Sequence, residues 1–98
     1  MPAYFIADAF VKNAQALEIF RAHAAPAVAR YGGRYLVRSG LAEAVEGSWK
    51  PSAVLIIEFP DLERARTWYR SAEYALALAV RDNAISRNLI LVDGMASF

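Results

Sequence analysis

The chain has 98 residues, of which 57% are hydrophobic and 21% are charged, so we expect one domain over residues 1–98 that is more apolar than most soluble domains. Its net charge of +1, with acidic and basic residues interspersed, gives no reason to expect nucleic acid or an anionic membrane surface as a partner. The absence of cysteine and the single histidine exclude disulfides, thiolate metal sites and histidine clusters, so we expect no metal site and no cofactor.

The first third of the chain predicts a strand followed by a long helix. Residues 3–10 are apolar on both alternating faces apart from Asp8, which is typical of a central strand. Asn13 is a good N-cap for a helix that runs to about Tyr31. Pro26 lies inside this helix and removes one backbone hydrogen bond, so we expect a kink or a short restart there. Gly32 is expected to end the helix in a left-handed conformation.

The middle of the chain predicts a hairpin that leads into the most apolar strand. Residues 34–38, with an uneven continuation to Glu46, alternate between polar and apolar, and Gly40 is expected to mark a bulge or a bend. A turn at residues 47–51 closes the hairpin. Residues 52–60 form the longest aliphatic and β-branched run, which indicates a central strand covered on both faces.

The last part of the chain predicts a helix in two pieces and a final strand. Asp61 is expected to cap the first piece and Ser71 the second. The helical pattern fades around residues 82–86, and residues 88–92 again read as a strand. No repeat, linker or low-complexity segment is evident.

The order strand, helix, strand, strand, helix, strand predicts an α+β protein with the ferredoxin-like split βαβ (β-α-β-β-α-β) fold. We expect an antiparallel four-stranded sheet with helices on one face, in which the first and third strands are central. The other sheet face would then be apolar and bare. Two such faces packed together would bury it, so we expect a homodimer of the dimeric α/β-barrel type.

The ends and the hydropathy of the chain predict a soluble protein. The first residues lack the basic segment and apolar core of a secretory signal. No apolar run approaches the length of about 20 residues that spans a bilayer. We therefore expect a cytoplasmic protein without a membrane partner.

Four segments resemble an uncharacterised family of small proteins, the domain of unknown function DUF1330. They are residues 31–40 (YGGRYLVRSG), 46–51 (EGSWKP), 57–60 (IEFP) and 65–74 (ARTWYRSAEY). The segments occur in the expected order, and the resemblance covers almost the whole chain. Ala72 departs from the pattern, since a proline is typical there. The family is grouped with the dimeric α/β-barrel superfamily, so the resemblance implies that fold and a homodimer. It implies no settled activity, because the superfamily includes cofactor-free monooxygenases, haem-degrading enzymes, chlorite dismutase-like proteins and ligand-binding modules.

Asp8, Arg38 and Glu58 are the polar residues that we expect to meet in the fold. We place Asp8 and Glu58 near the same ends of adjacent parallel strands. Across the hairpin we expect Gly40 and Leu41 opposite Glu58, so that Arg38 lies within one or two residues of it. Such a cluster could orient an anionic or polar ligand at the mouth of a pocket. The alternative, which we favour, is a structural ion pair at the end of the sheet.

His23 and Glu58 are the candidate catalytic residues. His23 could face the sheet as a base or a haem ligand, although its position beside the buried stripe of its helix favours an inert, partly exposed side chain. Pro2 offers a third candidate, because removal of Met1 would leave a secondary amine of the kind that tautomerases use as a general base.

Aromatic residues suggest a binding pocket. Trp68, Tyr69 and Tyr74 could line one, although Trp68 is better explained as core. We therefore expect a protein that binds a small organic molecule, planar or carboxylate-bearing, in a cleft between sheet and helices, with or without cofactor-free catalysis. The alternatives are a non-catalytic structural or regulatory dimer and a tautomerase-like enzyme that uses Pro2. The sequence does not identify a reaction.

Overall fold

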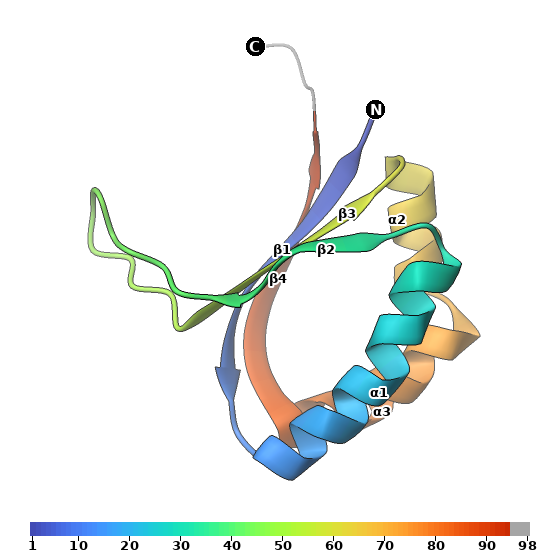
Figure 1. Cartoon of the computed structure of the whole chain (residues 1–98), viewed down its shortest axis with the longest axis horizontal. Coiled ribbons are helices and arrows are strands. Elements are labelled where there is room, and N and C mark those ends of the chain that lie inside the picture. Colours follow the sequence, from blue (N-terminus) through green and yellow to red (C-terminus); the bar gives the residue numbers. More distant parts are fainter. Residues whose placement is uncertain (95–98) are drawn as a thin grey trace.

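The computed structural model describes residues 1–94, which form one antiparallel sheet with three helices packed on one face (Figure 1). This arrangement confirms the predicted ferredoxin-like fold. In chain order the elements are β1 (Ala3–Val11), α1 (Ala14–Arg30), β2 (Arg34–Gly40), β3 (Ala53–Phe59), α2 (Leu62–Tyr69), α3 (Ala72–Ala84) and β4 (Ile85–Asp93).

The helices begin where the sequence predicts. The Asn13 side chain accepts a hydrogen bond from the backbone N–H of Ala16, and Asp61 and Ser71 cap α2 and α3 in the same way. These caps satisfy backbone donors that a first turn leaves free. Gly32 follows α1 with a φ of 80°, as expected for a left-handed helix end. Of the two expectations at Pro26, a kink or a short restart, the restart is absent, because α1 continues through Pro26 as one helix.

The strand order is β2-β3-β1-β4, so β1 and β3 are central as predicted. All neighbouring strands are antiparallel, however, including β1 and β3. Tyr4 pairs with Glu58 and Asp8 pairs with Val54. Asp8 and Glu58 each lie toward the C-terminal end of their own strand, and because these strands are antiparallel the two residues lie toward opposite ends of the sheet. This corrects the expectation that adjacent parallel strands bring them to the same end.

The core lies between the sheet and the helices and is rich in aromatic side chains. Trp68 and Tyr74 are each only 1% exposed, and their ring centroids are 4.1 Å apart. Phe5 and Phe59 each lie 5.1 Å from the Trp68 ring. Such rings contribute large buried areas and favourable ring-to-ring contacts. Trp68 is therefore the centre of the packing that holds α2 and α3 on the sheet.

The opposite face of the sheet is uncovered by helices (Figure 1). Strand alternation and register place apolar side chains there from the central strands and from β4. Ile90 is 57% exposed, and Ile6 and Ile56 beside it are half-buried. The apolar members of this open face are Tyr4, Ile6, Phe10, Val54, Ile56, Ile90 and Val92.

The connection between β2 and β3 projects away from the helices, on the side of the open face (Figure 1). We call residues 41–52 the β2–β3 arm. Leu41 is fully exposed and Trp49 is 66% exposed. The arm replaces the predicted continuation of β2 to Glu46, because β2 ends at Gly40. Register shifts on either side of Val37 and Arg38, together with a φ of 56° at Ser39, confirm the predicted irregularity near Gly40.

Candidate functional site

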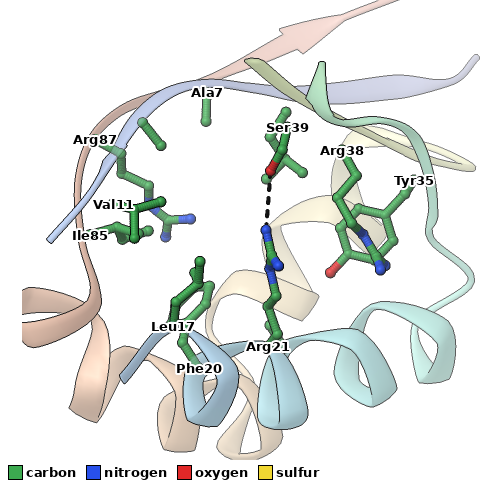
Figure 2. A pocket seen from close by; sticks show the side chains of 13 residues that line it. Ala7, Val11, Leu17, Phe20, Arg21, Tyr35, Arg38, Ser39, Ile85 and Arg87 are labelled. Atoms are coloured by element: carbon green, nitrogen blue, oxygen red, sulfur yellow. Dashed lines mark hydrogen bonds between the residues drawn. The ribbon is translucent and has the colours of Figure 1, made fainter. Parts of the chain in front are cut away.

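A cavity of about 70 Å³ lies between the sheet and α1 (Figure 2). Its walls are mainly apolar, with polar groups from α1, β2 and β4. The apolar lining consists of Ala7, Ala9, Val11, Leu17, Phe20, Ala24, Leu55 and Ile85, and the polar lining consists of Arg21, Tyr35, Arg38, Ser39 and Arg87. An apolar pocket with a few converging polar groups is typical of a small-molecule site.

Three arginines enter this cavity from three elements, and each has a contact that fixes its direction. Arg21 donates from Nη2 to Ser39 Oγ at 3.1 Å, which links α1 to the end of β2 (Figure 2). The Arg38 guanidinium lies 4.0 Å from the centre of the Tyr35 ring. Arg87 donates from Nη2 to the Tyr74 hydroxyl at 2.8 Å. These contacts leave other guanidinium donors free for a ligand.

The local sequence explains why the arginines point inward. Arg21 follows Leu17 by four residues and so shares the face of α1 that meets the sheet. Arg38 pairs with Leu55, which also lines the cavity. Arg87 pairs with Ala9 on β1. Each guanidinium is thus carried by a residue on the helix-covered side of the sheet or on the sheet-facing side of α1.

The site is positively charged. No carboxylate lines the cavity, and among residues 1–94 none of the three arginines forms an ion pair. Burial raises the pKa of both Tyr35 and Tyr74. The nearby arginines lower the pKa of each tyrosine, but their effect is smaller than that of burial. Both hydroxyls therefore remain protonated at neutral pH. They can donate hydrogen bonds as well as accept them.

Of the predicted cluster, the structure brings only Arg38 to this cavity. Asp8 and Glu58 lie on the open face of the sheet. Asp8 accepts hydrogen bonds from Trp49 Nε1 at 3.1 Å and from the backbone N–H of Ser52 at 3.0 Å. Glu58 pairs with Arg34 and not with Arg38. The placement of Arg38 beside Glu58 was wrong because the register of β2 against β3 differs from the one we expected.

The remaining candidates lie outside the cavity. Half-buried His23 lines a groove between α1 and α3 with Pro26 and Leu76. Trp68 is core, as favoured from the sequence. Tyr69 borders surface grooves beside β4. Tyr74 is not in the cavity lining but contacts two residues that are, Arg87 through a hydrogen bond and Phe20 through ring packing. Pro2 precedes β1 at the end remote from the cavity, where its carbonyl accepts a hydrogen bond from Gly94 N–H.

Sequence reasoning missed Arg21 and Arg87 as site residues. A signal for Arg21 was present, since it stands one turn after Leu17 on the apolar stripe of α1. Arg87 was missed because the last strand was expected to begin at residue 88, whereas β4 begins at Ile85. Alternation from Ile85 places Arg87 on the same face as Leu89 and Leu91.

Among residues 1–94 no group of three or more histidine, cysteine, aspartate or glutamate side chains is arranged to hold a metal ion. In the same part of the chain, no helix is both long and apolar enough to cross a bilayer.

Comparison with known proteins identifies the family. The sequence profile described as "Domain of unknown function (DUF1330)" matches residues 2–95. The chain belongs to the DUF1330 family. No curated protein is significantly similar to this DUF1330 protein in sequence.

Solved structures share its fold at low sequence identity. A protein of unknown function from Rhodopseudomonas palustris has a TM-score of 0.78 and 17% identity, over 98% of this chain and 84% of that one. SnoaB, a cofactor-independent oxygenase from Streptomyces nogalater, has a TM-score of 0.69 and 18% identity, over 98% and 95% of the two chains. A dimeric protein of unknown function with a ferredoxin-like fold from Bacteroides fragilis has a TM-score of 0.54 and 14% identity, over 95% and 96%.

Proposed function

We propose that this DUF1330 protein is a homodimer that binds a small organic molecule, planar or carboxylate-bearing, in the cavity between the sheet and α1. The observation that carries the proposal is the combination of an apolar wall with guanidinium groups that are not paired with carboxylates. Arg87, which is half-buried, supports the proposal most strongly, because partial desolvation of a guanidinium is unfavourable without a charged partner.

Arg38 and Tyr35 are the residues that we assign to the planar part of the ligand. The guanidinium of Arg38 lies against the Tyr35 ring at 4.0 Å. Together they form a flat surface with a charged edge. A planar ligand can stack on this surface and accept hydrogen bonds from its rim.

The experiment is a thermal-shift screen with small planar and aliphatic metabolites, followed by affinity measurements on Arg38→Lys. This variant keeps the charge but loses the planar fork of donors. Since Arg38 is exposed, the melting temperature should change little, while ligand affinity should fall about tenfold, equivalent to about 1.4 kcal/mol. The control is Arg64→Lys on α2, outside the cavity, which should leave both quantities unchanged. A lower melting temperature with intact affinity would assign Arg38 to the fold alone.

The homodimer is supported by the open apolar face and by the dimeric relative from Bacteroides fragilis. Apolar side chains from three strands lie exposed or half-exposed on that face. The β2–β3 arm, which projects on the same side of the sheet (Figure 1), carries exposed Leu41 and Trp49. Sedimentation at micromolar concentration should give a species of about twice the 10.8 kDa chain mass. A species of single-chain mass would contradict the dimer.

Catalysis without a cofactor is a second candidate, favoured by the fold shared with SnoaB. At 18% identity that likeness extends to the fold alone. Three guanidiniums around an apolar cavity would stabilise a negative charge that develops on a bound substrate. Oxygen consumption should then accompany conversion of a ligand found in the screen. Binding without oxygen uptake or product would leave a non-catalytic ligand-binding dimer.

A further inference from the structure

We infer that the cavity is selective for a short-chain carboxylate, whose carboxylate group is held by Arg87 and whose apolar tail lies against α1 and the sheet. This inference rests on the proposed function and specifies its ligand class. Arg87 has no established role, and the sequence did not point to it.

The first observation is how Arg87 is held. It extends from β4 into the space above α1 (Figure 2) and is the most buried of the three cavity arginines. Nη2 donates to the hydroxyl of Tyr74 at 2.8 Å, and Tyr74 is itself 1% exposed and fixed in the core. The guanidinium also lies 5.6 Å from the centre of the Phe20 ring. The side chain is thus oriented before any ligand arrives, which lowers the entropic cost of binding.

The second observation is the charge around Arg87. A guanidinium has five N–H donors, and the hydrogen bond to Tyr74 uses one of them. Arg21 and Arg38 add positive charge to the same cavity, with no carboxylate in its lining. A carboxylate can accept two parallel hydrogen bonds from one guanidinium. Binding of a carboxylate would compensate the partly buried charge of Arg87, which has no ion-pair partner among residues 1–94.

The third observation is size. The cavity holds about 70 Å³, roughly half the volume of an engineered 150 Å³ cavity that binds benzene. The walls beside Arg87 are aliphatic or aromatic, with Leu17, Phe20 and Ile85 among them. The space therefore suits a tail of about two to four carbon atoms. A bulky polycyclic acid would have to leave most of its surface outside.

Matched acid and amide probes test the inference at constant pH and ionic strength. Butyrate should bind and raise the melting temperature, whereas butyramide, which has the same shape without the charge, should bind at least tenfold more weakly. Acetate should bind more weakly than butyrate, by about fourfold for each methylene group that is no longer buried. Equal affinity for butyrate and butyramide would overturn the inference and leave the proposed function standing. Failure of both probes, and of every compound in the wider screen, would overturn both.

Variants distinguish specific binding by Arg87 from a general effect of the protein's positive charge. Arg87→Gln should weaken butyrate binding about tenfold or more, and Tyr74→Phe should weaken it less, since it only releases the guanidinium. Arg64→Gln removes one positive charge outside the cavity and should leave the affinity unchanged. If Arg87→Gln destabilises the fold, Arg87→Lys provides a second variant that keeps the charge and loses the two-pronged geometry. An unchanged butyrate affinity in both Arg87 variants, or an equal loss in Arg64→Gln, would overturn the assignment.

Discussion

Arg34 and Glu58 face each other across β2 and β3, with Arg34 Nε 2.7 Å from Glu58 Oε1. The Tyr4 hydroxyl donates to the other carboxylate oxygen at 3.1 Å. This group lies on the open face of the sheet, whereas Arg38 lines the cavity on the helix side. The cluster expected from the sequence is thus divided between the two faces of the sheet.

The acid sensitivity of folding should depend on Glu58. The hydrogen bond from Arg34 is the largest cause that holds the pKa of Glu58 below its ordinary value, and Tyr4 contributes in the same direction. A lowered folded-state pKa gives stability that is present above the unfolded pKa of about 4.3 and is lost as pH falls through the folded pKa. Glu58→Gln should therefore make the denaturation midpoint fall less steeply with pH below about 4.3. Parallel curves for the two proteins would contradict this prediction.

A double-mutant cycle should assign the partner of Glu58. Glu58→Gln and Arg34→Gln should be non-additive in their effects on unfolding, because the two side chains share a hydrogen bond. Glu58→Gln and Arg38→Gln should be additive, since they lie on opposite faces of the sheet. The coupling between Glu58 and Arg34 should be small and reduced by salt, because the Arg34 side chain is 71% exposed. Coupling to Arg38 in place of Arg34 would mean that the register is wrong.

Local signals predicted the elements of this fold well, and long-range register was the part that failed. Asn13, Asp61 and Ser71 cap helices through bonds to residues three positions later, so their role is readable from a short window. The pairing of β2 with β3 is not local. It depends on two register shifts and on the 12-residue arm, and a long irregular connection does not fix strand register as a tight turn does.

The cavity was predictable only in part. Arg38 was a candidate pocket residue in the less favoured of two interpretations, and it lines the cavity. To predict that Arg21 and Arg87 line the cavity, one must know which helix face meets which strands. A shift of one residue in a strand moves a side chain to the other face. The late expected start of β4 was sufficient to hide Arg87.

Asp8 should hold the base of the β2–β3 arm. It accepts hydrogen bonds from Trp49 and Ser52, which flank the return of the chain into β3. Asp8→Ala should lower the free energy of unfolding by about 1 kcal/mol, since these bonds are partly exposed. Amide hydrogen exchange across residues 45–52 should accelerate, while the remainder of the sheet stays protected. Glu43→Ala, which removes a carboxylate from the arm itself, serves as the control and should alter neither quantity.

Trp68 should behave as core and not as a ligand contact. Trp68→Ala should lower the free energy of unfolding by about 3–5 kcal/mol, because it removes a fully buried ring. Trp68→Phe should cost less. It keeps an aromatic ring and also removes Nε1–H, which is buried without a hydrogen-bond partner among residues 1–94. Ligand affinity in Trp68→Phe should equal that of the wild type, and a clear loss would place Trp68 in the site.

The two neighbouring isoleucines of β3 provide a matched test of the dimer. Ile56 pairs with Ile6 on the open face, while Ile57 pairs with Phe5 on the helix face and is 2% exposed. A buried, unpaired carboxylate in the core is strongly unfavourable, so Ile57→Asp should abolish cooperative folding. Ile56→Asp should instead give a folded monomer, because its charge would be half-buried in the single chain and fully buried only in the assembled dimer. Circular dichroism measures folding and sedimentation measures mass. A folded Ile56→Asp protein that remains dimeric would show that the interface lies elsewhere, and an unfolded one would be resolved with Ile90→Asp, at an exposed position of the same face.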